Sequence, residues 1–194
     1  MVEVHTGVDA HSGMHVDQGA LPGEHPGRAS NPIIKVHDIA WLEFEKPDLV
    51  KAEAFATAFG FTVPHRTTEE VHLRGTETGA PCVIIRKGNR TRFVGAAFLG
   101  ADEADVLVLG KRTGNRVSRL PESIGGIGVT LHDPGGQPVR VVAGMNQLPS
   151  LPGQRAHTFN FDEPLTRVNA TQRPPREPAR VQRLGHVVIS RTRY

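Results

Sequence analysis

The segment Asp38-Ile-Ala-Trp-Leu-Glu-Phe44, followed by Pro47-Asp48 and the stretch Leu49–Phe59, decides the fold. Apolar residues alternate with polar ones into the first of these segments, which is typical of a half-buried strand. Along Leu49–Phe59 they recur at three- and four-residue intervals, which predicts a helix with one face buried against a sheet. Asp48 is suited to cap the start of this helix, and Gly60 is suited to end it.

Three short antiparallel strands are predicted to follow this helix, because apolar runs alternate with turns that contain glycine. They are expected at Phe61–Thr67, Glu70–Arg74 and Cys82–Lys87. The first part of the chain is therefore predicted to form a unit of one strand, one helix and three strands.

A second unit of the same kind is predicted to begin at Thr91. Its expected elements are a strand at Thr91–Leu99, a helix around Ala101–Gly110, and strands at Ile127–His132 and Pro138–Val142. Asp133-Pro-Gly-Gly136 separates the last two strands and is a turn sequence, because proline fixes φ and glycine permits positive φ. The repeat of roughly 55 residues is too long for a solenoid and predicts an α+β fold of paired βαβββ modules that share one core.

The segments that flank these modules differ from them in composition. Residues 1–31 are rich in Gly, His, Pro and Ser, so we expect a disordered leader, and its four histidines match no closed metal site. Residues 146–182 are Pro-rich and predict a linker between domains. Residues 183–194 repeat the pattern of the first strand, with His186 at the place of Trp41.

Composition indicates the class of protein. With 38% hydrophobic and 22% charged residues, the 194-residue chain is long enough for one packed domain with extensions. It has no apolar run that could span a membrane and no secretory signal pattern at its start, so we expect a cytoplasmic protein. The single cysteine, Cys82, lies in an apolar run and is expected to be a core residue.

The formal net charge of +3 raises the question of a nucleic-acid partner. The arginine excess is local to Arg173–Tyr194, lacks interleaved aromatic residues and lies partly in the Pro-rich segment. We therefore expect a solvated linker that pairs with a neighbouring domain, with no nucleic-acid partner.

Taken in order, these segments resemble the vicinal oxygen chelate superfamily. They are the strand and helix ending at Phe59-Gly60-Phe61, the segment His132–Val142, and Arg183–Ile189. Their order is most similar to type I extradiol catechol dioxygenases, over residues 33–194. The resemblance implies that residues 32–145 are a metal-free N-terminal domain and that residues 183–194 are the first strand of a truncated catalytic domain.

The resemblance also implies a metal centre, in which two His and one Glu hold Fe(2+) in the catalytic domain of the complete enzyme. His186 matches the first of these ligands. In the N-terminal modules the ligand positions fall on Trp41, Gly95 and Arg140, none of which would bind iron. Because one imidazole gives little affinity, this chain alone is expected to bind no iron and to be inactive. His37, His65, His72, His132 and His157 are assigned no role in catalysis.

For the complete enzyme, the resemblance implies insertion of both atoms of dioxygen into a catecholic ring, with the catechol and dioxygen as substrates and a homo-oligomer possible. Two alternatives stay open. One is a non-catalytic module of the bleomycin-resistance type that binds a small molecule. The other is a glyoxalase-like lyase or isomerase that uses another divalent metal.

Overall fold

The structure is a computed structural model that describes residues 32–154 and 177–189. The described residues from Val36 onward belong to one compact unit. The predicted leader and much of the predicted linker lie outside the described residues. Within the described ranges, no helix is long and apolar enough to cross a membrane.

The first module follows the predicted order of elements. It contains β1 (Val36–Lys46), α2 (Leu49–Phe59), β2 (Thr62–Arg66), β3 (Glu70–Arg74) and β4 (Val83–Lys87). The Asp48 side chain accepts a hydrogen bond from the backbone N–H of Lys51, and Gly60 ends α2 at a φ of 110°. Both predicted caps are confirmed, because a carboxylate satisfies a free helical N–H and glycine tolerates the left-handed conformation.

The second module repeats this order, with one strand that the sequence did not predict. It contains β5 (Arg92–Gly100), α3 (Glu103–Thr113), β6 (Val117–Arg119), β7 (Ile127–His132) and β8 (Pro138–Ala143). β6 has only three residues, too few to show an alternating pattern. The prediction that the helix ends near Gly110 is wrong, since Gly114 is its cap, at a φ of 70°.

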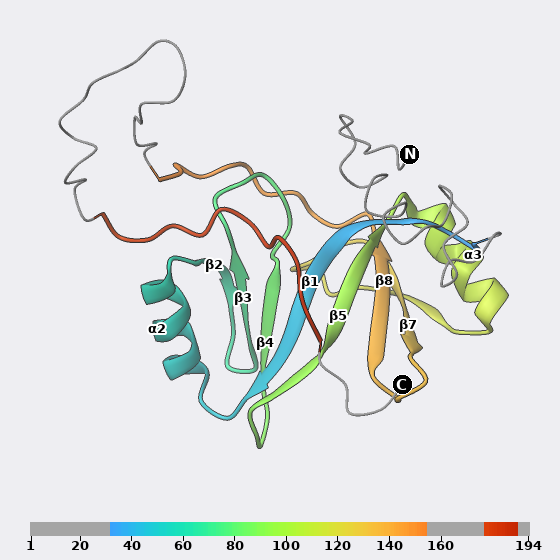
Figure 1. Ribbon diagram of the computed structural model, residues 1–194, viewed down its shortest axis with the longest axis horizontal. Helices are drawn as coiled ribbons and strands as arrows, with labels where there is room; N and C mark the ends of the chain where they lie inside the picture. Colours follow the sequence, from blue (N-terminus) through green and yellow to red (C-terminus); the bar gives the residue numbers. More distant parts are fainter. Residues whose placement is uncertain (1–31, 155–176, 190–194) are drawn as a thin grey trace, which may run out of the picture. The chain divides into compact units, whose positions relative to one another are not determined.

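The eight strands of the described residues form one sheet in the order β2-β3-β4-β1-β5-β8-β7-β6. β1 is parallel to β4 and β5 is parallel to β8, whereas β1 and β5 are antiparallel and join the two modules. Figure 1 shows β1 and β5 side by side at the centre. The predicted α+β fold of paired βαβββ modules is confirmed.

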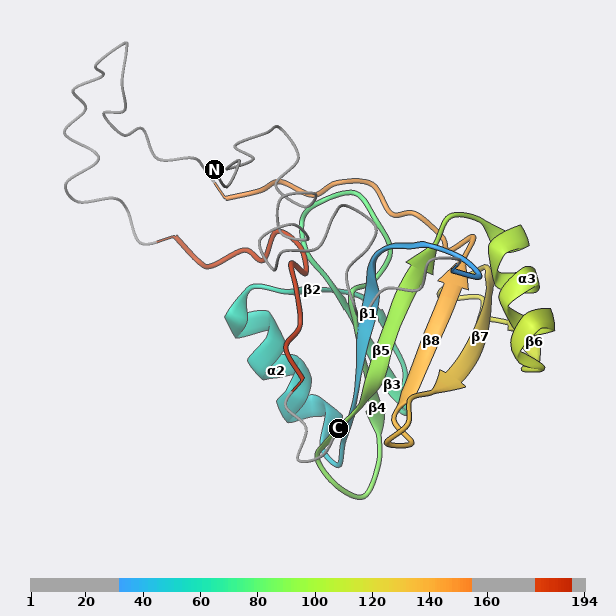
Figure 2. The same ribbon diagram turned by 45° about the vertical axis from the view of Figure 1, so that its right-hand side comes forward.

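One face of the sheet packs against the helices. Leu49 and Ala56 of α2 belong to a buried cluster with Val71 and Leu73 of β3, and a Cβ placed on Gly100 would lie against both Val106 of α3 and Val141 of β8. Figure 2 shows α2 beside the first module and α3 beside the second.

Because side chains alternate along a strand, the residues next to these apolar ones point to the opposite face, which we call the inner face. A second buried cluster lies here and is built on Trp41 of β1, Ile84 of β4, Ala97 of β5 and Val142 of β8, with Ala40 and Ile124 packed against them. The inner face also carries polar side chains, which line up beside this cluster across several strands.

Residues 177–189 run along the first module without forming a strand. The backbone N–H of Val181 donates to the Gly60 carbonyl at 2.9 Å, and the Thr76 N–H donates to the Val181 carbonyl at 2.9 Å. A Cβ on Gly75 would lie 2.1 Å from the Gln182 carbonyl oxygen, so the close approach depends on glycine. The strand expected from residue 183 is not formed by residues 183–189, and its assignment to a further domain stays a prediction.

Candidate functional site

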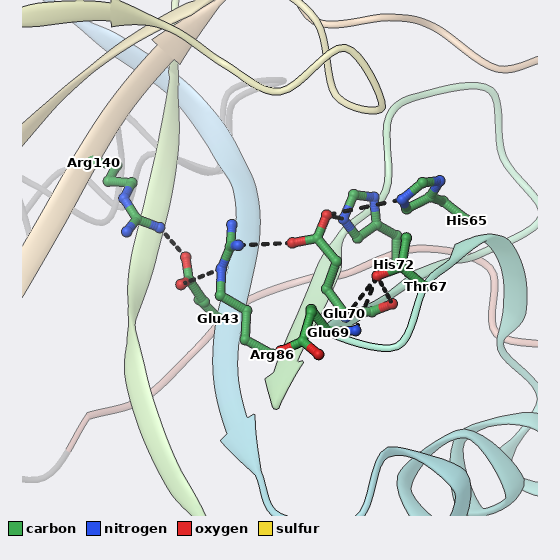
Figure 3. Close-up of polar contacts among 8 residues, drawn as sticks. All are labelled: Glu43, His65, Thr67, Glu69, Glu70, His72, Arg86 and Arg140. Carbon is green, nitrogen blue, oxygen red and sulfur yellow. Dashed lines mark hydrogen bonds and ion pairs between the residues drawn. The ribbon is translucent and has the colours of Figure 1, made fainter. Parts of the chain in front are cut away.

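A row of charged side chains crosses the inner face, with Glu43 of β1 between Arg86 of β4 and Arg140 of β8 (Figure 3). The Nε of Arg86 donates to Oε1 of Glu43 at 2.9 Å. Arg140 donates to the other carboxylate oxygen. The Glu43 side chain is only 4% exposed. A carboxylate buried to this degree depends on the two guanidinium groups for compensation of its charge.

β5 lies between Glu43 and Arg140 in the sheet, and its small residues allow the ion pair to form across it. Glu43 is paired with Gly95, and Arg140 is paired with Ala97. A Cβ on Gly95 would lie 2.4 Å from the Pro138 carbonyl oxygen. The close approach of β8 therefore excludes a side chain at this position.

The row continues to the edge of the sheet through Glu70 of β3. Its Oε2 accepts a hydrogen bond of 2.7 Å from Nη1 of Arg86. Its Oε1 lies 3.0 Å from Nε2 of His72 and 3.9 Å from Nε2 of His65. The two imidazoles are opposite each other in the β2–β3 pair, with ring centroids 4.7 Å apart. We call His65, Glu70 and His72 the His–Glu–His cluster.

Thr67 organises the turn that brings these residues together. Its hydroxyl oxygen accepts hydrogen bonds from the backbone N–H groups of Glu69 at 3.1 Å and of Glu70 at 3.0 Å. Its own backbone N–H donates to the Glu70 carbonyl at 2.8 Å. A local side-chain cap of this kind sets the register of the hairpin. That register places His65 opposite His72.

Burial makes the two histidines different. The His72 side chain is 0% exposed, whereas that of His65 is 35% exposed. Burial is the main cause that lowers the pKa of His72 below its ordinary value of 6.5, and the neighbouring Glu70 opposes it. His72 is therefore neutral at pH 7. No described residue hydrogen-bonds to its Nδ1, which is buried.

The His–Glu–His cluster has the composition of a metal site. One possible ligand atom from each residue lies within 4.8 Å of the others. Imidazole nitrogen and carboxylate oxygen are the donors that Zn²⁺ and related divalent metals take. Within residues 32–154 and 177–189, this cluster is the one group of three or more His, Cys, Asp or Glu residues placed closely enough to hold a metal ion.

Sequence reasoning assigned no role to His65 or His72, although the signal was present. Glu70 and His72 stand two residues apart on a predicted strand, so they share a face. Pairing the strands Phe61–Thr67 and Glu70–Arg74 as a hairpin brings His65 to the same face. The prediction failed to use the register of this hairpin.

The three positions that the resemblance aligns with iron ligands carry other interactions. Trp41 is 2% exposed within the apolar cluster of the inner face. Gly95 has no side chain, and Arg140 is paired with Glu43. These residues do not fit an iron centre. His186 is exposed and is not part of the His–Glu–His cluster, so its role as a ligand stays a prediction.

Cys82 is partly buried against the apolar cluster that contacts α2. Burial raises the pKa of its thiol above the ordinary value, so the protonated thiol dominates at neutral pH. This agrees with the prediction of a core residue, because a nucleophilic cysteine requires the thiolate.

The sequence of this chain matches no protein-family model, and no curated protein matches it. Its structure is similar to homoprotocatechuate 2,3-dioxygenase from Arthrobacter globiformis, with a TM-score of 0.55, 22% identity, and coverage of 63% of this chain and 41% of that one. It is also similar to the Brevibacterium fuscum enzyme in complex with 3,4-dihydroxyphenylacetate, with a TM-score of 0.54, 21% identity, and coverage of 62% and 40%.

A Mn(II)-bound glyoxalase from Novosphingobium aromaticivorans is similar as well, with a TM-score of 0.54, 20% identity, and coverage of 63% of this chain and 44% of that one. The described fold is therefore similar to the fold of these dioxygenases and of this glyoxalase, in agreement with the fold that the resemblance implied. The matched part of the chain spans less than half of the length of these three proteins.

Proposed function

We propose that residues 32–145 are the scaffold domain of an extradiol-type ring-cleaving dioxygenase and that residues 183–194 begin its catalytic domain. The observation that carries the proposal is the similarity of the paired modules to homoprotocatechuate 2,3-dioxygenases. The matched part covers 41% of the Arthrobacter globiformis enzyme and 40% of the Brevibacterium fuscum enzyme. The aligned ligand positions agree with it, because Arg140 is engaged with Glu43 there. A domain built in this way supports a catalytic domain and supplies no iron ligand of its own.

In the complete enzyme, His186 would be the first of the Fe(2+) ligands, and the two others would lie beyond this chain. The substrates would be a catechol and dioxygen. Both oxygen atoms enter the product when the ring carbon–carbon bond beside the hydroxyls breaks, so no further reductant is needed. A cytoplasmic location and a homo-oligomer belong to the same proposal.

The test begins with the coding sequence that follows Tyr194, read in all three frames and expressed as an extended chain. Loaded with ferrous iron without air and then mixed with aerated 3,4-dihydroxyphenylacetate, the extended protein should form a yellow ring-opened product. His186→Ala should abolish iron retention and product, whereas the control His132→Ala should keep both. Absence of a second pair of modules, or of product from any catechol, would refute the proposal.

A second candidate function is the binding of an apolar small molecule, and a groove beside α2 favours it. The groove has a volume of about 620 Å³, which suits a small organic ligand. Its walls are mostly apolar: Leu42, Phe44, Ala52, Phe55, Ala56, Phe61, Leu73, Val83, Ile85 and Leu184. This would be the function of a module of the bleomycin-resistance type.

Fluorescence titration with a planar apolar dye tests this candidate. Ala52→Phe should fill part of the groove and weaken dye binding at least tenfold. Val108→Phe on α3 makes the same kind of change on the other helix and should leave dye binding unchanged. Equal dye binding by both variants would exclude the groove as the binding site.

The glyoxalase-like alternative has less support, since Trp41, Gly95 and Arg140 supply no metal ligand.

A further inference from the structure

We propose that His65, Glu70 and His72 form a binding site for a divalent transition metal of the Zn²⁺ type on the β2–β3 hairpin. Each residue offers a ligand atom within 4.8 Å of the others. The site is separate from the aligned ligand positions Trp41 and Arg140, and the inference does not depend on the proposed dioxygenase function.

Glu70 is already oriented for this role by its neighbour. Arg86 holds Oε2 at 2.7 Å, which leaves Oε1 on the side of the two imidazoles. A hydrogen bond to the second oxygen of a ligating carboxylate is a common outer-shell interaction at metal sites. The positive charge of Arg86 opposes a cation, but Glu43 compensates it through the hydrogen bond of 2.9 Å to its Nε.

His72 is the buried member of the cluster, and its side chain is 0% exposed. Its Nε2 lies 3.0 Å from Oε1 of Glu70, so this nitrogen is the ligand atom that a cation shared with Glu70 would take. Because the ring is packed in the protein interior, this ligand is already held in place beside Glu70.

Access to the cluster is available through His65, whose side chain is 35% exposed. With two nitrogen ligands and one oxygen ligand from the protein, a tetrahedral metal would have one position left for water. All three ligands come from one hairpin at the edge of the sheet. A bound metal would therefore join the edge strand β2 to β3 and stabilise the hairpin against fraying.

The test uses the whole 194-residue chain, freed of metal with a chelator and titrated with Zn²⁺ by calorimetry and with Co²⁺ by visible absorption. His65→Asn and Glu70→Gln should each lose one equivalent of tightly bound metal and the Co²⁺ absorption band. His132→Asn, a histidine change in the other module, should retain both. The leader histidines are present in every variant, so their contribution cancels in the comparison.

Thermal unfolding supplies a second readout. Saturating Zn²⁺ should raise the Tm of the parent and of His132→Asn by roughly 5 °C, because the metal binds the folded hairpin, and should not raise that of His65→Asn. His65 is partly exposed, so its replacement should leave the circular dichroism spectrum unchanged. Unchanged metal stoichiometry and affinity in both His65→Asn and Glu70→Gln would overturn the proposal.

Discussion

The two modules have the same backbone order but different side chains at equivalent places. Their equivalence follows from the strand pairs Leu42–Val83 in the first module and Ala96–Val139 in the second. With these pairs superposed, Trp41 corresponds to Gly95 and Ile84 corresponds to Arg140. The first module fills these positions with apolar bulk, whereas the second has no side chain at one and a charge at the other. One backbone therefore supports a packed core or a polar site according to its side chains.

The edge hairpins differ in the same way. In the same superposition, Glu70 and His72 correspond to Gly128 and Thr130 of β7. Neither residue of the second module is a ligand for a transition metal of the Zn²⁺ type. The His–Glu–His cluster is therefore a property of one hairpin and not of the repeated fold.

The two helices complete the comparison. α3 carries the acidic residues Glu103 and Asp105 in its first turn and the basic residues Lys111 and Arg112 in its last. In contrast, α2 has no acidic residue in its first turn and no basic residue in its last. Gly110 lets α3 approach Val117 closely, since a Cβ there would lie 2.4 Å from Cγ2 of that valine. The first module instead has an apolar groove beside α2.

The largest expected effect comes from making the first module resemble the second at its centre. Trp41→Ala removes the largest side chain of the inner-face cluster and should cost about 3–5 kcal/mol of the free energy of unfolding. Urea denaturation followed by circular dichroism measures this loss. Val188→Ala, at an exposed apolar residue, is the control and should change the free energy very little. A loss below about 1 kcal/mol for Trp41→Ala would show that the cluster does not support the fold.

The charged row should respond next. Glu43→Gln removes the carboxylate that pairs with Arg140 and leaves Arg86 with Glu70 as its remaining carboxylate partner among the described residues. It should destabilise the fold by about 2–4 kcal/mol, since one partner of a buried pair is lost. Glu45 pairs with Arg92 and is more exposed than Glu43. Glu45→Gln should therefore lower the free energy of unfolding by under about 1 kcal/mol. Similar losses in the two variants by urea denaturation would contradict the distinct role of Glu43.

Acid should destabilise the first module through His72. Its pKa in the folded state is lowered, so below the ordinary value of 6.5 the unfolded chain binds more protons than the folded one. Stability should be complete above pH 6.5 and should fall as the pH drops below it, by up to about 1.4 kcal/mol per pH unit. His72→Gln should flatten this dependence in thermal unfolding between pH 5 and 7. If the stability of His72→Gln depends on pH as steeply as that of the parent protein, the pH dependence arises from other titratable groups.

The smallest effect concerns the equivalent helix positions Ala56 and Gly110. Alanine favours helices, but Gly110→Ala should still destabilise the protein by about 1 kcal/mol because the added methyl meets Val117. Gly114→Ala, at the positive-φ cap, should cost a similar amount for a backbone reason. If Gly110→Ala proves stabilising in urea denaturation, the close packing of α3 is refuted.

Much of the fold follows from local pattern. The bounds of Leu49–Phe59, Glu70–Arg74 and Ile127–His132 agree with prediction because apolar periodicity, caps and turns act within a few residues. β6 was missed because three residues carry no period. The helix end was misplaced at Gly110 because the glycine serves packing against Val117 there and does not cap the helix.

The candidate site was less predictable, since it depends on partners far apart in the sequence. The absence of ligands at Trp41, Gly95 and Arg140 could be read from residue identity alone. The pairing of Arg140 with Glu43 could not, because it requires the register of three strands and the small residues of β5. Only the hairpin of His65 and His72 was within reach of sequence reasoning, through the pairing of its two predicted strands.

The sequence by itself determined the order of elements, the helix caps and the repeat of the βαβββ unit, because short-range sterics and apolar periodicity specify them. The tertiary structure alone decided which side chains meet. It buried Glu43 between two arginines, removed His72 from water and placed His65 and Glu70 beside it. Burial and distance set the charge state and ligand capacity of these groups, and both arise only when separate strands are brought into register.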